Sequence, residues 1–334
     1  MSKKILALVL LLCLAGSVAA QLVSLPKARK KAVYGMDFFV SPSAYDYTLM
    51  ARRIVAGAET DYDKAQRIYL WLCDNVKFDA TGAVRTADET WTSRTAVCQG
   101  YCELFYRMAE TVGVKTKLVN GKCRRPLAHG KLENHVWLQV ATERGEILVD
   151  PTWGAGFMFN KKFVRLKEPL LWFDVDPAWL IFSHLPKNER RQHLDPVVSD
   201  EQFAALPYVT PLAAQLGIAS REALKQQLEG GEELPVVRMQ DASWPQQLRL
   251  KSVPTVRHLH KDSTYTFVVE KIATEAQLSL DTDATVYGEA QWQHEGNLYT
   301  LTLTPQQQGP LCLTLHTLQG IFMQSQRIVE YVVE

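Results

Sequence analysis

The sequence predicts an α+β region followed by an all-β region. Between residues 60 and 113, apolar side chains recur twice at steps of three and four residues, which is the period of an amphipathic helix. Residues 114–150 alternate between apolar and polar side chains, as strands do. From residue 234 onward only short alternating runs remain, broken by Pro305 and by Gly309-Pro310. The chain therefore mixes helices and strands first and continues in strands alone.

The first twenty residues have the pattern of a secretory signal peptide. Ser2-Lys3-Lys4 precedes an apolar run over residues 5–14 and a small-residue stretch over residues 15–20. The apolar run is too short to span a bilayer. We expect cleavage before Gln21, a secreted or periplasmic protein, and no integral membrane segment after cleavage. Roughly 310 residues would remain, which favours two domains over one core.

Composition excludes some partners. The chain has 37 Lys and Arg against 36 Asp and Glu, a net charge of +1, so its overall charge gives no reason to expect nucleic acid. Five cysteines follow the signal peptide, namely Cys73, Cys98, Cys102, Cys123 and Cys312. An odd and low count argues against a disulfide scaffold, and at least one cysteine must stay free or pair with another molecule.

Two helices are predicted before the strands. The first begins behind a Thr60-x-x-Asp63 cap, and the polar stretch 79–94 after it reads as a loop. The second has Ser93 and Thr95 as candidate N-caps and Gly113 as its terminating glycine. Cys98 then falls in the first helical turn, where unpaired backbone N–H groups and the helix dipole favour a thiolate.

Antiparallel strands are predicted over residues 114–119, 135–140 and 147–150, with a turn at Asn120-Gly121. A second turn near residues 142–145 makes positions whose numbers sum to about 285–287 face each other. His135 and Asp150 sum to 285, so their side chains become cross-strand neighbours within reach of a hydrogen bond.

Cys98, His135 and Asp150 together predict a catalytic triad. A cysteine enzyme needs a thiolate nucleophile, an imidazole that exchanges its proton, and an acceptor that orients the imidazole. Cys98 would attack an acyl carbon, His135 would transfer the proton, and Asp150 would hold the second ring nitrogen. The backbone N–H of Cys98 would donate to the developing oxyanion.

The motifs that carry these residues resemble a known family. Val97-Cys98-Gln99-Gly100-Tyr101, Asn134-His135-Val136-Trp137 and Val149-Asp150-Pro151-Thr152-Trp153-Gly154 resemble, in order and spacing, the transglutaminase-like core. Further along, the chain resembles the extension of the kyphoscoliosis-peptidase branch, at Trp172-Phe173, Asp176-Pro177, His184-Leu185-Pro186 and Phe203. The resemblance covers roughly residues 60 to 207 and implies a papain-like α+β core.

The resemblance also implies acyl transfer through a thioester, with amide hydrolysis, deamidation or transamidation as its outcome. Leu138 and Cys102 depart from the residues usual in the family, which leaves the acyl-acceptor site, and so the reaction, open. We favour hydrolysis of peptide or protein amide bonds over transamidation. The alternative is a binding or scaffold protein that keeps the core without turnover.

Gln99, Trp137 and Trp153 are the predicted substrate-binding residues, although tryptophans at strand ends pack in cores as often as they line clefts. No cofactor or metal is predicted. A zinc site drawn from Cys98, Cys102, Cys123, His129 and His135 is disfavoured, because no Cys-x-x-Cys or paired-His spacing is present.

The predicted domain order follows from these patterns. After the signal peptide (1–20) come a catalytic domain with an aromatic-rich extension (21–207), a linker (208–233) and a β-sandwich of immunoglobulin-like type (234–334). The linker contains an amphipathic stretch that ends at Gly230-Gly231. Expected partners are a peptide or protein substrate and a cell-envelope or extracellular polymer.

Overall fold

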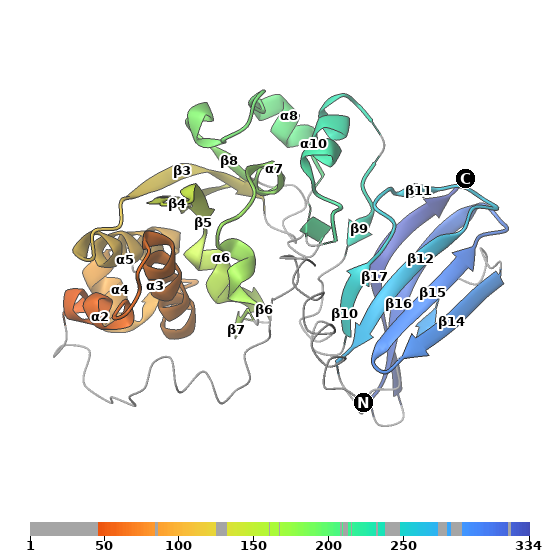
Figure 1. Ribbon diagram of the computed structural model, residues 1–334, viewed down its shortest axis with the longest axis horizontal. Coiled ribbons are helices and arrows are strands. Elements are labelled where there is room, and N and C mark those ends of the chain that lie inside the picture. The colour runs from red at the N-terminus through yellow and green to blue at the C-terminus, as the bar shows by residue number, and fades with distance from the viewer. Residues whose placement is uncertain are drawn as a thin grey trace, which may run out of the picture. The chain divides into compact units, whose positions relative to one another are not determined.

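The computed structural model (Figure 1) describes most of the chain after residue 45. The described residues are 46–83, 86–124, 132–159, 161–166, 168–207, 209, 213–214, 216–231, 233–237, 248–272, 279–281, 289–319 and 322–334. The predicted signal peptide and His129 lie outside these ranges. Within them, no helix combines the length and the apolar character needed to cross a membrane.

Helices α2 (Tyr47–Ile54), α3 (Asp61–Asn75), α4 (Ala87–Ser93) and α5 (Cys98–Thr111) make up the helical part of the α/β region. As predicted, the Thr60 side chain caps α3 by accepting a hydrogen bond from the backbone N–H of Asp63.

The prediction of a loop over residues 79–94 is wrong, because α4 lies within it. Its polar composition suggested a loop, but Thr86 and Glu89 form a reciprocal capping box that starts a helix. Trp91 of this helix stacks on Trp71 of α3, with ring centroids 5.6 Å apart. The helix has seven residues, and the polar side chains of its exposed face give this stretch of sequence the composition of a loop.

The predicted N-caps of α5 are also wrong. Thr95–Ala96 form strand β2, which pairs with β1 (Lys77–Phe78), and the N-cap residue is Val97, whose side chain makes no capping bond. The other end agrees with the prediction, since Gly113 follows the helix with a φ of +81°. Cys98 is the first residue of the helix.

A four-stranded sheet with the order β5-β4-β3-β8 lies beside α3 and α5 (Figure 1). Its strands are β3 (Thr116–Arg124), β4 (Leu132–Thr142), β5 (Gly145–Val149) and β8 (His184–Pro186). Helix α5 packs against β3 and β4. The β4–β5 hairpin pairs Leu138 with Val149 and Thr142 with Gly145, within the predicted register.

Strand β3 runs straight through Asn120-Gly121, so the predicted turn there is wrong. The glycine is needed for space rather than for a turn. A Cβ at Gly121 would lie 2.2 Å from the carbonyl oxygen of Leu185 and 2.5 Å from the Trp137 ring. Its absence lets β8 and Trp137 approach the strand closely.

The segment after β5 is more regular than predicted. It contains the short elements α6 (Pro151–Ala155), β6 (Gly156–Phe159), β7 (Lys162–Arg165), η2 (Pro169–Trp172), α7 (Pro177–Leu180), η3 (Glu189–Arg191) and α8 (Asp200–Ala205). Between α7 and η3 the chain returns to the sheet as β8. Within the predicted linker, Ser220 caps α10 (Arg221–Leu228).

The C-terminal β region contains two sheets. One has the order β10-β12-β15-β14, and the other has the order β11-β17-β16-β13 with β9 also paired to β17. Their strands are β9 (Val236–Val237), β10 (Leu248–Ser252), β11 (His258–Leu259), β12 (Tyr265–Lys271), β13 (Ser279–Asp281), β14 (Glu289–Glu295), β15 (Leu298–Thr304), β16 (Gly309–Gln319) and β17 (Phe322–Val333). Phe267 of one sheet meets Tyr331 of the other edge to face, at 5.7 Å between centroids.

Candidate active site

The start of α5 presents Cys98, which is partly exposed. One turn later, Cys102 lies on the inner side of the same helix, fully buried, and its thiol donates to the carbonyl oxygen of Val136 at 3.3 Å. This contact joins α5 to β4 one residue beyond His135. The helix start is thereby held against the strand that carries the histidine.

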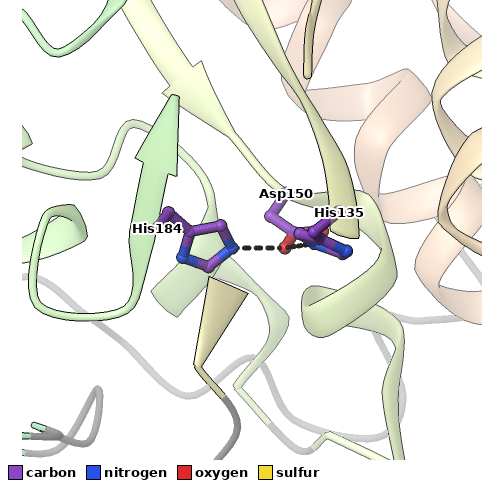
Figure 2. A group of neighbouring side chains, drawn as sticks. All are labelled: His135, Asp150 and His184. Atoms are coloured by element: carbon purple, nitrogen blue, oxygen red, sulfur yellow. Dashed lines mark hydrogen bonds and ion pairs between the residues drawn. The ribbon is translucent and has the colours of Figure 1, made fainter. Parts of the chain in front are cut away.

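His135 and Asp150 meet as the hairpin register requires. Because Leu138 pairs with Val149, His135 and Asp150 are diagonal neighbours on one face of the hairpin. Figure 2 shows the two side chains in contact, with His135 Nε2 2.7 Å from Asp150 Oδ2. His135 is 6% exposed and Asp150 is 1% exposed. Since Nε2 is bonded to the carboxylate, Nδ1 is the nitrogen left to exchange a proton with a thiol.

Asp150 accepts hydrogen bonds on both oxygens. It is the N-cap of α6, and its Oδ1 accepts from the backbone N–H groups of Thr152 at 2.9 Å and Trp153 at 3.1 Å. Its Oδ2 lies 3.1 Å from Nε2 of a second histidine, His184, as well as 2.7 Å from His135 (Figure 2). Four donors thus surround a carboxylate that has about four acceptor positions.

The Cys98 thiol and the His135 imidazole shift each other's pKa. Burial alone raises the pKa of Cys98, but a hydrogen bond and the charge of His135, with a backbone contribution from Val136, lower it below the ordinary value. Burial alone lowers the pKa of His135, yet the charge and hydrogen bond of Asp150, with a smaller effect of Cys98, raise it to about 9. Both shifts favour a thiolate paired with an imidazolium.

The pKa values of the other two groups, Asp150 and His184, are both lowered. Burial opposes ionisation of Asp150, but its charge interaction and hydrogen bond with His135, and those with His184, hold its pKa well below the usual range. Burial lowers the pKa of His184 to about 4, against the opposing effect of Asp150. At neutral pH the site therefore contains one carboxylate, one charged imidazole and one neutral imidazole.

His184 is the residue of this cluster that the sequence did not predict as part of the site. In the sequence, His184 belongs only to the His184-Leu185-Pro186 motif of the extension. No local spacing in the sequence links His184 to Asp150, because the two residues are 34 positions apart. His184 reaches Asp150 because β8 pairs with β3 in the sheet.

The three predicted substrate-binding residues lie in different settings. Gln99 is partly exposed, and its amide donates to Glu103 at 2.7 Å. Trp153 is partly exposed, with its ring 5.5 Å from that of His135. Trp137 is only 1% exposed and packs against His135 and His184. Substrate contact by these residues stays a prediction, and the burial of Trp137 favours a packing role.

The His135, Asp150 and His184 side chains also have the composition of a metal-binding group, with ligand atoms within 4.8 Å of one another. The observed spacing is that of hydrogen bonds, since 2.7 Å separates His135 Nε2 from Asp150 Oδ2. Ligands of a tetrahedral zinc at about 2.0–2.2 Å from the metal lie roughly 3.3–3.6 Å apart. Hydrogen bonding therefore accounts for the cluster. No disulfide joins any two of the five described cysteines.

Comparison with known proteins agrees with the motifs. Residues 48–151 match the profile of the Transglutaminase-like superfamily. The chain is 31% identical to kyphoscoliosis peptidase of Homo sapiens and 30% identical to that of Mus musculus, each over 161 residues and 44% of this chain. A solved structure described as a TGase aligns with a TM-score of 0.27 and 15% identity, over 44% of this chain and 37% of that one.

The predicted resemblance is thus confirmed, and residues 48–151 form a transglutaminase-like core. The chain spans only 24% of the length of the kyphoscoliosis peptidases that it matches.

Proposed function

We propose that this protein is a secreted cysteine-nucleophile enzyme that cleaves peptide or protein amide bonds through a thioester. The observation that carries the proposal is the coupling of the Cys98 thiol to His135, whose other ring nitrogen is bonded to Asp150. These are the nucleophile, proton carrier and orienting group that thiol catalysis requires.

The chemistry follows from this arrangement. The Cys98 thiolate adds to the carbonyl carbon of the amide, and the backbone N–H of Cys98 at the start of α5 donates to the oxyanion. The C–N bond then breaks, and the proton on Nδ1 of His135 passes to the departing amine. A thioester on Cys98 and a neutral His135 remain.

The second half returns the enzyme to its starting state. Neutral His135 accepts a proton from water, which adds to the thioester carbonyl, and the Cys98 thiolate departs to give a free acid. An amine in place of water gives transamidation instead. The printed name of the matched relatives, kyphoscoliosis peptidase, supports hydrolysis.

The ends of the chain supply two further parts of the proposal. The signal-peptide pattern of residues 1–20 supports export, which N-terminal sequencing tests by finding Gln21 first in protein recovered outside the cytoplasm. The two-sheet C-terminal region supports an immunoglobulin-like module that holds the enzyme against a cell-envelope or extracellular polymer.

Alkylation tests the nucleophile without a substrate. Iodoacetamide at pH 6.5 should label Cys98 first, because its pKa is lowered while burial raises the pKa of Cys73 and Cys102. A Cys98→Ala variant should lose the fast phase. Equal labelling of the two proteins, with the label on other cysteines, would refute the proposed nucleophile.

Turnover separates the enzyme from the alternative, a scaffold with an inactive core. Peptide libraries, and glutamine peptides with added amines, should yield free acids rather than isopeptides. Fast alkylation at Cys98 with no product from either panel would favour the scaffold.

A further inference from the structure

His184 has hydrogen-bonding partners on both sides of its ring. It comes from β8, at the edge of the sheet, and its side chain is fully buried. Nε2 lies 3.1 Å from Asp150 Oδ2 (Figure 2). Nδ1 lies 2.7 Å from the Ser183 hydroxyl. The proposed mechanism assigns this histidine no step.

These contacts place a proton on Nε2 and leave two possible states for Nδ1. An ionised Asp150 can only accept, so Nε2 of His184 carries a proton and donates it. A neutral ring then has a free lone pair on Nδ1, which accepts from Ser183. A charged ring would instead donate from Nδ1 to Ser183, whose hydroxyl would turn to the carbonyl oxygen of Leu180 at 3.2 Å.

The surroundings favour the neutral ring. The imidazole of His184 is enclosed by three tryptophan rings, with centroids 4.5 Å away for Trp153, 5.1 Å for Trp137 and 5.5 Å for Trp172. A charge in this setting loses its hydration. The nearby His135 imidazolium would repel a second positive charge as well.

We propose that His184 is a positioning residue, neutral at neutral pH, whose Nε2–H shares Oδ2 of Asp150 with His135 and thereby limits how firmly the carboxylate keeps a proton on His135. The inference rests on the role of His135 proposed above. His135 must give its proton to the leaving amine and then act as a neutral base. A carboxylate oxygen that served His135 alone would stabilise the imidazolium more and make the proton transfer to the leaving amine less favourable.

The sign of the effect follows from the shared oxygen. The proton of His184 places a partial positive charge beside the imidazolium and occupies acceptor capacity on Oδ2. Both effects favour neutral His135, so removal of this donor should raise the pKa of His135. Among the described residues, Asp150 and Cys98 are the other groups whose charge shifts the pKa of His135 most.

Asp150 has further titratable neighbours, but they stay uncharged. Their pKa values are raised, mainly by burial, and they are Tyr69, Cys73, Tyr101 and Cys102. They carry no charge near neutral pH, so they add no charge that would alter the pKa of His135.

A matched pair of variants tests whether the Nε2–H donor of His184 lowers the pKa of His135. His184→Gln keeps an N–H that can reach Asp150, whereas His184→Met has a similar shape and no donor. Both are made in a Cys98→Ala parent, so that thiol ionisation does not complicate the titration of His135. NMR of ¹⁵N-histidine-labelled full-length protein then reports the pKa of His135 and the tautomer of His184.

His184 in the parent should carry its proton on Nε2 and stay neutral from pH 5 to 9. His184→Met should raise the pKa of His135 by about one unit, a tenfold change in its protonation constant, and His184→Gln by no more than about a third of that. Equal pKa values in the two variants, a lowered pKa with Met, or a proton on Nδ1 of His184 would overturn the proposal.

A further variant keeps the test decisive. If His184→Met does not fold, Ser183→Ala replaces it, because loss of the hydroxyl weakens the polarisation of Nε2–H and should raise the pKa of His135 by a smaller amount. An unchanged pKa in Ser183→Ala would then count against the proposal. None of these readings needs turnover, so a protein without amidase activity would refute the proposed function and leave this inference standing.

Discussion

The α/β region and the β region differ in what they bury. Among residues whose burial is described, every buried polar or charged side chain lies between Thr90 and Gln192, and these are Thr90, Arg124, His135, Gln139, Asp150, Thr152, Ser183, His184 and Gln192. After residue 234 the described buried side chains are aliphatic or aromatic, with Cys312 among them. One region has a polar network inside it, and the other has an apolar interior.

This difference shows which region contains buried polar groups that are costly to desolvate. Burial of a polar group without a partner costs roughly 1–3 kcal/mol in proteins, and burial of a charge costs more. Asp150 is tolerated because four donors surround it. Such a network is retained where its chemistry is used, whereas the apolar interior of the β region needs only to pack.

The largest expected effect comes from the nucleophile. Cys98→Ala should reduce kcat for amide hydrolysis by about 10⁵-fold or more, because no other group can form the thioester. Cys312→Ala, a change of the same kind at a buried cysteine of the β region, should leave kcat unchanged. Steady-state kinetics on both variants measure these kcat values. A Cys98→Ala enzyme with near-normal kcat would contradict the role of Cys98 as the nucleophile.

Asp150→Asn should lower kcat by about 10³- to 10⁴-fold. Asparagine can still cap α6, but its amide cannot accept from both histidines and leaves His135 in the wrong tautomer. Asp176→Asn is the control, since Asp176 caps α7 through the N–H of Ala178 and has no histidine partner in the described structure. Asp150→Asn should also be the less stable variant, because Asp150 is buried and bonded to two histidines, so kcat is compared per folded molecule. Equal kcat values on that basis would refute the role of Asp150.

Leu303→Ala should lower the free energy of unfolding by about 2–5 kcal/mol, because Leu303 is fully buried in the β region. Leu298→Ala, on the same strand but 39% exposed, should cost less than about 0.5 kcal/mol. In both, Cys98 should alkylate at the wild-type rate per folded molecule. A changed alkylation rate in Leu303→Ala would show that packing in the β region affects the site in the α/β region.

The smallest expected effect is a pH dependence of stability that belongs to the α/β region. The pKa of His184 is about 4 when folded and near 6.5 when unfolded, so its contribution is complete above pH 6.5 and is lost as the pH falls toward 4. The pKa of His135 is raised to about 9, so its contribution is complete below pH 6.5 and is lost only as the pH rises through 9.

Between pH 6.5 and 4.5, wild type should therefore lose about 2 kcal/mol more of its unfolding free energy than His184→Gln does. Urea unfolding at the two pH values measures the difference. Parallel pH profiles of the two proteins would show that His184 is not held neutral in the folded state.

Several features could be predicted because their cause is local. The Thr60 cap, the glycine after α5 and the β4–β5 hairpin each depend on residues close together in sequence. The hairpin register alone brought His135 to Asp150, since two strands joined by a short turn have few possible pairings. The capping box of α4 was equally local, and its polar exposed face concealed it.

Other features could not be predicted, because they depend on partners far away in the chain. Gly121 looked like a turn residue until β8 and Trp137 were found against it. His184 reached Asp150 only because β8 pairs with β3, across more than sixty residues from Gly121 to Pro186. No periodicity in the sequence reports such a pairing.

The sequence by itself determined which residues carry the proposed chemistry and which of them lie on one hairpin, because motif spacing and strand alternation act over a few residues. Only the tertiary structure decided that Asp150 serves two histidines and that one of them is buried neutral. Desolvation and the sharing of an acceptor depend on what surrounds a group in space, and the chain order alone does not specify those surroundings.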